Sequence, residues 1–486
     1  MTDEPSKSSA EQTYEMLYGK PKASVNQATG DEMRDMVLNR QAPLTNAREF
    51  LLRERLPPIK FWRGAFYIWV GSHYRQLEDQ AVDNGIWMFL DKMKVLNDKG
   101  AVVEFNPQPQ DVRKTFEALK PITMVSTLVE APSWLANGID KKPADCIAFT
   151  NGIYHWPSKT LLKQDPDFFN TAAIGVAYDN ALPPPTEWLG FLNTLWPDDP
   201  DSIRCLRQII GYLMTYDTSF QKIFAFIGVK RGGKGTILRV IQEIMGRENY
   251  SSSTASDFGS DFGLQSAIDK LAVFFPDMIM KGLRGDAQAK LAGNFKAISG
   301  EDSVNAKRKY LSDYVGKLSA RIVLAANEAI SVSDASGALS SRLILLKFTH
   351  SFYGNEDRTL FSQKLRPELA SIAMWALAGL DDLNEQHHFT QSQSGTDEIN
   401  DIERLGSPVA AFVADRCTVA TGAWCLKDQL YVEWGVWCSR NNAKTITLDQ
   451  FARDLFSNLG AKVSKGRPTI EGKRVHTFTG IAINPE

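Results

Sequence analysis

A glycine-rich segment between an apolar run and an amphipathic stretch constrains the fold of this chain more than any other feature. Residues 223–227 predict a short buried strand, and the apolar spacing of residues 237–245 predicts a helix. In a phosphate cradle of this order, glycines let backbone N–H groups approach phosphate oxygens, the helix N-terminus adds positive dipole, and a lysine reaches the outer phosphates. We therefore predict a phosphate-binding loop, made of Gly228, Val229, Lys230, Arg231, Gly232, Gly233, Lys234, Gly235 and Thr236.

The loop departs at one position from the pattern G-x-x-x-x-G-K-[ST]. Gly235 occupies the place of the Ser or Thr, and Thr236 follows it. Thr236 is therefore our candidate for the hydroxyl that contacts a magnesium ion. The alternative is a glycine-rich hairpin with no ligand, which the order of strand, loop, lysine and helix disfavours.

Three polar residues downstream complete a candidate nucleotide site. Asp277 follows the apolar run 271–275 and is the natural magnesium partner; Asn327 ends the run 321–326 and is placed to hold the lytic water or the γ-phosphate. Arg342 precedes another apolar run and is a candidate finger that reaches a neighbour's nucleotide. The alternative for the last two is a turn cap and a surface arginine. We assign Lys234, Asp277, Asn327 and Arg342 as catalytic candidates, and Thr236 and Asp277 as metal ligands.

Composition excludes several classes of protein. The 486 residues are 43% apolar and 23% charged with a net charge of -2, which excludes a polycationic coat protein. No apolar run approaches the roughly 20 residues that span a bilayer, and the first residues start no signal peptide, so we expect a soluble cytoplasmic protein with no membrane partner. The five cysteines are scattered without a C-x-x-C pair, which disfavours a disulfide framework or a zinc knuckle.

The pattern of polar and apolar segments predicts an α/β chain with several parts. Residues 1–44 are polar and predict a disordered arm, 45–182 an α+β accessory domain, 183–385 the nucleotide-binding domain with flanking helices, and 386–404 a linker. Asn151 and Gly152 predict a β-hairpin inside the accessory domain.

Residues 405–486 predict a small separate domain. Thr447 begins a capping box, and the helix that follows is expected to stop at Gly460. Two short runs then flank residues 471–473 and predict a basic β-hairpin. Helices followed by such a hairpin indicate a winged-helix-like DNA-binding domain.

In their order, these motifs resemble those of the superfamily 3 helicases. More narrowly, the chain is similar to the helicase part of the phage and plasmid primase-helicases, which are related to the poxvirus-type helicase-primase. The resemblance covers roughly residues 60–486 and rests on the order of the phosphate loop, Asp277, Ser299-Gly300-Glu301-Asp302, Arg308-Lys309, Asn327-Glu328, residues 334–339 and Arg342. Further matches are residues 351–354 and Glu356-Asp357.

The resemblance implies an AAA+-type ATPase that uses ATP and Mg²⁺ and forms a ring, usually a hexamer, around DNA. Two departures matter. Met278 and Ile279 follow Asp277, so an arginine found there in relatives is absent. Only about 60 residues precede the part of the chain that the resemblance covers, so we expect a helicase without a primase domain, working with a separate primase or a host polymerase in a bacterial cell.

Local charge predicts where DNA is bound. Residues 281–321 contain nine Lys and Arg against four acids, a net +5 within a chain of -2. The family places a hairpin here that points into the ring channel, so Lys307, Arg308 and Lys309 are candidate contacts to single-stranded DNA, with Tyr310 beside them. Lys473 and Arg474 in the C-terminal hairpin are candidate contacts to duplex DNA at a fork.

These features predict an ATP-dependent, ring-forming DNA helicase that serves replication of a phage or another mobile element. One alternative is a DNA-binding replication initiator whose nucleotide site only controls assembly. A second alternative is a monomeric P-loop kinase. Duplex unwinding separates the first from a helicase, and hydrolysis stimulated by DNA separates the second.

Overall fold

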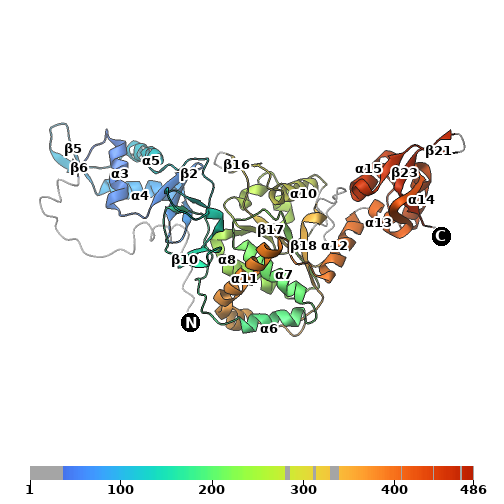
Figure 1. Ribbon diagram of the computed structural model, residues 1–486. Helices are drawn as coiled ribbons and strands as arrows, with labels where there is room; N and C mark the ends of the chain where they lie inside the picture. Colours follow the sequence, from blue (N-terminus) through green and yellow to red (C-terminus); the bar gives the residue numbers. More distant parts are fainter. Residues whose placement is uncertain are drawn as a thin grey trace. The chain divides into compact units, whose positions relative to one another are not determined.

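The computed structural model describes residues 37–279, 285–309, 313–328, 339–406, 408–441, 443–470 and 473–484. The chain divides into two compact units, Met1–Ala173 and Ile174–Glu486 (Figure 1). Among the helices of these ranges, none combines the length and apolar character that crossing a membrane requires.

In the first unit, helices α3, α4 and α5 of the described residues pack on a small antiparallel sheet. The sheet has the order β2-β3-β4, and its inward side chains share one apolar core with the helices. Phe66 and Phe89 lie in this core and are fully buried. The elements are β1 (Val37–Leu38), α3 (Pro43–Arg53), β2 (Ile59–Trp62), β3 (Ala65–Trp69), β4 (Tyr74–Leu77), α4 (Asp79–Asp91), β5 (Lys94–Leu96), β6 (Val102–Glu104) and α5 (Pro109–Thr123).

Short strands complete the first unit. The hairpin predicted at Asn151 and Gly152 is confirmed, because β8 and β9 pair antiparallel with Phe149 opposite Gly152. These strands are β7 (Ser133–Trp134), β8 (Cys146–Phe149), β9 (Gly152–His155), β10 (Thr160–Leu162) and β11 (Phe168–Phe169).

The second unit is built on a five-stranded parallel sheet with the order β13-β14-β17-β12-β18. The strand β12 that enters the glycine-rich loop lies between β17 and β18, and β17 separates it from β14. Since all strands run in one direction, their carboxyl ends lie at one edge of the sheet. The strands are β12 (Ile223–Gly228), β13 (Tyr250–Ser252), β14 (Ala272–Phe275), β17 (Arg321–Ala326) and β18 (Leu343–Phe348).

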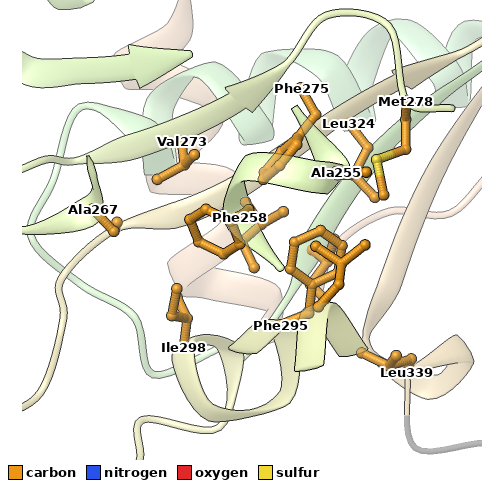
Figure 2. Close-up of a cluster of buried hydrophobic side chains, with 14 of the residues drawn as sticks. Ala255, Phe258, Ala267, Val273, Phe275, Met278, Phe295, Ile298, Leu324 and Leu339 are labelled. Atoms are coloured by element: carbon orange, nitrogen blue, oxygen red, sulfur yellow. The ribbon is translucent and has the colours of Figure 1, made fainter. Parts of the chain in front are cut away.

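Both faces of this sheet are apolar, as expected for a parallel sheet covered by helices. One face packs against α9 (Ala255–Phe258) and α10 (Gly285–Ser299), and Figure 2 shows Phe258, Phe275 and Phe295 pointing toward one another there. The rings of Phe258 and Phe275 meet edge to face at 5.2 Å. The other face carries Phe224 and Phe226, and Tyr212 of α7 meets Phe224 at 6.1 Å.

Helices also lie near the opposite face of the sheet, and one of them is capped by a distant carboxylate. They are α6 (Thr186–Leu195), α7 (Pro200–Leu213), α8 (Lys234–Met245) and α11 (Leu369–Gln386). The carboxylate of Glu368 accepts hydrogen bonds from the backbone N–H groups of Glu187 and Trp188 at 3.1 and 2.9 Å. It therefore caps the N-terminus of α6, whose first N–H groups have no partner inside the helix.

Arg321 joins the start of β17 to the end of α7. Its guanidinium is almost fully buried and donates to the carbonyls of Tyr212, Leu213 and Thr215 at 3.2, 2.7 and 2.6 Å. Burial lowers the pKa of Arg321 to about 10, so the side chain stays protonated at neutral pH. A cation at the carboxyl end of a helix is favourable because the last carbonyls point toward it.

The C-terminal part of the second unit is a small module with its own apolar core. Its three-stranded antiparallel sheet has the order β19-β23-β20, and a two-stranded hairpin, β21–β22, projects between β20 and β23. Thr447 caps α15 as expected, and that helix ends before Gly460. The elements are α13 (Pro408–Arg416), β19 (Cys417–Leu426), α14 (Lys427–Arg440), α15 (Leu448–Leu459), β20 (Ser464–Gly466), β21 (Thr469–Ile470), β22 (Lys473–Arg474) and β23 (Thr477–Ile483).

Two expected boundaries differ from the structure. Of the predicted arm 1–44, residues 1–36 lie outside the described residues, but β1 pairs in parallel with β5 and α3 starts at Pro43. The two-residue strand β1 is too short to give a periodic signal. The units divide at Ala173, before the prolines at 183–185, since Gly175 already packs against Gly246.

The predicted linker 386–404 is wrong for most of its length. Helix α12 (Gln393–Gly406) occupies it, and Ile402 is 6% exposed within the core under the sheet, with Ile399 packed beside it. Lys347 of β18 pairs with Glu398 at 2.8 Å, which holds the helix against the edge strand. The polar composition of this segment gave no clear helical pattern, because its apolar stripe is narrow. Two isoleucines one turn apart are enough to pack the helix against the edge of the sheet.

A core substitution tests this assignment of α12. Ile402→Ala should lower the free energy of unfolding of the second unit by about 2–5 kcal/mol, because it leaves a cavity under the sheet. Asn400→Ala changes an exposed position of the same helix and should have little effect. Chemical denaturation monitored by circular dichroism measures the free energy of unfolding of both variants. Equal stability of the two variants would contradict the packing of α12 and favour a linker.

Candidate functional site

The glycine-rich loop is a tight turn between β12 and α8 whose shape depends on two glycines. Gly228 has a φ of 147°, and a Cβ atom there would lie 1.9 Å from the carbonyl oxygen of Phe348. Gly233, directly before α8, has a φ of 87°, and its Cβ would lie 2.9 Å from a methyl carbon of Leu195. Such φ values are strained for other residues, so these positions need glycine. Arg231 also has a positive φ of 59°.

Lys234 is folded onto its own loop. Its ammonium donates to the carbonyl oxygens of Gly228 and Val229 at 2.6 and 2.7 Å, and the side chain is 8% exposed. Burial lowers the pKa of Lys234, while the carboxylate of Asp277 acts in the opposite direction. The lysine is therefore positioned inside the loop, with a carboxylate near enough to affect its charge.

The predicted residues from three strands converge on one cavity. Lys234, Thr236, Asp277 and Asn327 all line a cavity of about 940 Å³ at the carboxyl edge of the sheet. They come together because β12, β14 and β17 are neighbours and end at the same edge. Hydroxyl and carboxylate oxygens are the ligands that Mg²⁺ prefers, so Thr236 and Asp277 suit a magnesium site.

Not all of the predicted loop faces this cavity. Arg231, Gly233, Lys234, Gly235 and Thr236 line it. The remaining predicted residues, Gly228, Val229, Lys230 and Gly232, are not among its lining residues; of these, Val229 and Lys230 are exposed.

Two further segments line the cavity and carried no sequence signal for a nucleotide site. One is the start of α6, with Thr186, Glu187 and Phe191; the other is the segment 352–364 beyond β18. Their neighbours in sequence are ordinary helix and turn residues. The family resemblance includes Glu356 and Asp357 but implies no role for them.

The segment after β18 crosses the phosphate loop. The hydroxyl of Ser351 donates to the carbonyl of Lys230 at 3.0 Å, and the N–H of Phe352 donates to the carbonyl of Arg231 at 3.1 Å. Glu356 lies 3.6 Å from Arg231. Backbone contacts therefore fix the outer turn of the loop.

Asp357 has a structural role at the cavity rim. It accepts hydrogen bonds from the hydroxyl and N–H of Thr359 and from Lys364, which lower its pKa to about 2. Its carboxylate is thus engaged by its own segment.

Arg342 does not belong to the cavity of its own chain. It precedes β18, whereas the phosphate loop follows the paired strand β12, so roughly 20 Å of strand separates them. Its Nη1 donates to the carbonyl of Lys296 at 2.6 Å and to the hydroxyl of Ser299 at 2.9 Å, at the end of α10. The structure therefore brings Lys234, Asp277 and Asn327 together and places Arg342 at the opposite edge.

A hairpin precedes β17, as the family pattern implied. Strands β15 (Val304–Ala306) and β16 (Tyr314–Gly316) pair antiparallel, and Lys307, Arg308 and Lys309 follow β15 directly. Lys307 pairs with Asp261 at 3.4 Å, a contact that offsets part of its charge. Tyr310 lies outside the described residues.

The C-terminal candidates lie on a projecting hairpin. Lys473 and Arg474 form β22, and Arg474 is exposed. The side chain of Lys473 lies outside the described part of the chain.

Comparisons with known proteins match two segments and the overall fold. Residues 62–197 match the model described as D5 N terminal like, and residues 226–342 match a family of unknown function (DUF5906). The A form apo structure of the NrS-1 C-terminal region has a TM-score of 0.51 at 12% identity and covers 90% of this chain and 99% of that one. The chain therefore shares the fold of that region.

Two further solved structures are less similar. A second apo structure of the NrS-1 C-terminal region has a TM-score of 0.49 at 13% identity, covering 90% of this chain and 99% of that one. A JCV helicase bound to a small molecule has a TM-score of 0.27 at 18% identity, covering 44% and 63%.

A pair of glycine substitutions tests the loop. Gly228→Ala should abolish nucleotide binding, because its methyl group would collide with the backbone of Phe348 and displace the loop. Gly235→Ala is the matched control, since a Cβ there meets nothing within 4 Å, and it should bind nearly as wild type. Titration with a fluorescent ATP analogue measures both; equal binding by the two variants would mean that the loop does not hold phosphate.

Proposed function

We propose that this chain is an ATP-dependent DNA helicase motor of the superfamily 3 type that works in replication of a phage or another mobile element. The observation that carries the proposal is the convergence of Lys234, Thr236, Asp277 and Asn327 on one cavity at the carboxyl edge of a parallel sheet. The D5 N terminal like match over residues 62–197 agrees with the resemblance to poxvirus-type helicase-primases.

The four converging residues have distinct tasks in the proposed hydrolysis. The backbone N–H groups of the loop and the ammonium of Lys234 bind the phosphates, for which Lys234 exchanges its carbonyl partners for phosphate oxygens. Thr236 and Asp277 would hold Mg²⁺, which neutralises charge on the outer phosphates. Asn327 orients the γ-phosphate or the attacking water from the end of β17.

Assembly into a ring, usually a hexamer in this family, gives Arg342 its role. Its position at the amino edge of the sheet is too far from its own loop for a contact with bound nucleotide. In a head-to-tail ring, that edge of one subunit meets the nucleotide of the next, where the guanidinium stabilises charge on the γ-phosphate. The core is then of AAA+ type.

DNA binding is assigned to two hairpins. In a ring, β15–β16 carries Lys307, Arg308 and Lys309 toward a single strand in the channel. We assign the C-terminal module as a winged helix, with β21–β22 as its wing. The assignment is supported by helices α13, α14 and α15, which precede or interleave with a sheet of order β19-β23-β20. Its Lys473 and Arg474 are placed to contact duplex DNA at a fork.

A strand-displacement assay with ATP and Mg²⁺, run beside a sizing measurement, tests the proposal. The wild-type protein should unwind a forked duplex and elute as a ring. Lys234→Ala should abolish hydrolysis and unwinding while the protein stays folded, because the ammonium of Lys234 donates to carbonyls of its own loop and joins no two elements of the core. Ring formation and DNA binding without displacement would instead identify a nucleotide-controlled initiator, and hydrolysis that DNA does not stimulate would favour a kinase.

Mixing two inactive variants tests the position of Arg342. Arg342→Ala should bind ATP almost normally, yet hydrolyse it about 10³–10⁵-fold more slowly, as for other arginine fingers. When Arg342→Ala protein is mixed with Lys234→Ala protein, some interfaces join an intact Lys234 loop to an intact Arg342. Part of the ATPase activity should therefore return.

The variants contain their own controls. Normal ATP binding by Arg342→Ala shows that losing the contacts to Lys296 and Ser299 leaves the fold intact. Continued inactivity of a mixture whose proteins co-assemble would contradict a role across the interface, and normal turnover by either variant alone would contradict the motor.

A further inference from the structure

The segment of the C-terminal module that follows α15 is rich in positive charge. Residues 460–476 contain five cations and a single carboxylate, Glu471. Helix α15, by contrast, contains two carboxylates, Asp449 and Asp454, and one cation, Arg453. The segment after the helix is therefore strongly basic, while the helix itself is slightly acidic.

The basic side chains after α15 are open to solvent. The exposed cations are Lys462, Lys465, Arg467 and Arg474. Ion pairs of this module join Arg416 to Glu433 and Lys427 to Asp449, and across its described residues none of the four exposed cations contacts a carboxylate.

Two of these cations are held in position by neighbours that leave their charge uncompensated. Arg467 donates through Nε to Nδ1 of His476 at 3.2 Å. The ammonium of Lys465 lies 5.4 Å from the centre of the Phe456 ring. Side chains that are already oriented lose less conformational entropy when they bind a phosphate.

The exposed face of α15 is unsuited to the major groove. The side chain of Asp449 is 89% exposed and its nearest cation, Lys427, lies 3.9 Å away. Arg453 is bonded to Gln450, and Gln450 in turn to Asp454. A helix in the groove lies between two rows of phosphates, which repel carboxylates and favour the opposite balance of charge.

We propose that this module binds the phosphate backbone of duplex DNA through the hairpin side, with Lys462, Lys465, Arg467 and Arg474 as the contacts and α15 outside the major groove. The inference rests on the proposed function and defines how the DNA is held. Since phosphate contacts carry no base information, binding is independent of sequence. Residues 460–476 contain no Phe, Tyr or Trp, and the ring of His476 is engaged by Arg467, so this segment itself offers no row of free aromatic rings for stacking a single strand, which favours a duplex.

Salt dependence of duplex binding tests the inference. We measure how the binding constant for a blunt duplex, without nucleotide, falls with salt concentration, as the slope of log K against log salt. In the full-length double variant Arg467→Ala/Arg474→Ala this slope should be smaller in magnitude by up to about 1.8, because each lost phosphate contact lowers it by about 0.9. The loss should be the same for two duplexes of unrelated sequence. Arg453→Ala removes one charge from α15 and should leave the slope unchanged, while Arg467→Lys/Arg474→Lys should keep it.

The outcomes separate this inference from the proposed function. An unchanged salt slope in the double variant would contradict the inference. So would weaker binding by Arg453→Ala whose loss differs between the two duplex sequences. Thermal melting of each variant shows whether the module is folded, and the lysine pair distinguishes lost charge from lost structure. If the wild-type protein hydrolyses no ATP but the salt slopes change as expected, the helicase proposal is wrong and the duplex-binding surface is supported. If the wild-type protein unwinds DNA normally but the salt slopes of the variants are unchanged, the helicase proposal is supported and the duplex-binding surface is wrong.

Discussion

The parallel pairing of β17 between β12 and β14 is the constraint on which the candidate site depends. Each strand leads into a residue to which we assign a different chemical role, and the hydrogen-bonded register fixes how far apart the strand ends lie. Ile227 opposite Ala326, and Phe275 opposite Leu324, bring Gly228, Asp277 and Asn327 to one edge. A shift of β17 by one residue would turn its buried side chains to the other face, so core packing also protects the geometry of the site.

Buried polar contacts set that register from the other edge. Arg321 is held by carbonyls at the end of α7, so the first residue of β17 cannot slide without leaving a buried cation unpaired. Loss of a partner from a buried charge costs several kcal/mol, far more than a surface ion pair. Glu368, which is only partly buried, anchors α6, which lines the cavity, through the N-terminal N–H groups of that helix.

In the proposed function, the two edges of the sheet have separate tasks. The carboxyl edge gathers the groups that we propose to hold phosphate, whereas Arg342 and Lys222 lie at the amino edge, where Lys222 donates to the carbonyl of Ser341 at 2.9 Å. A chain that places its candidate finger away from its own nucleotide needs a neighbour to complete the site. Oligomerisation thereby becomes part of the proposed chemistry.

The amino-acid sequence alone predicts the glycine-rich loop between a strand and a helix, the strands that lead to Asp277 and Asn327, the hairpin at Gly152 and the cap at Thr447. Each of these depends on local backbone chemistry: glycine at positive φ, a run of buried residues, or a side chain that reaches its own backbone. Three features could be seen only in the folded chain: α12 covers the sheet, α6 and residues 352–364 complete the cavity, and Arg342 lies at the far edge. These features depend on contacts between residues distant in sequence, such as Ile402 against the sheet and Glu368 at the start of α6, for which no local pattern of residues carries a signal.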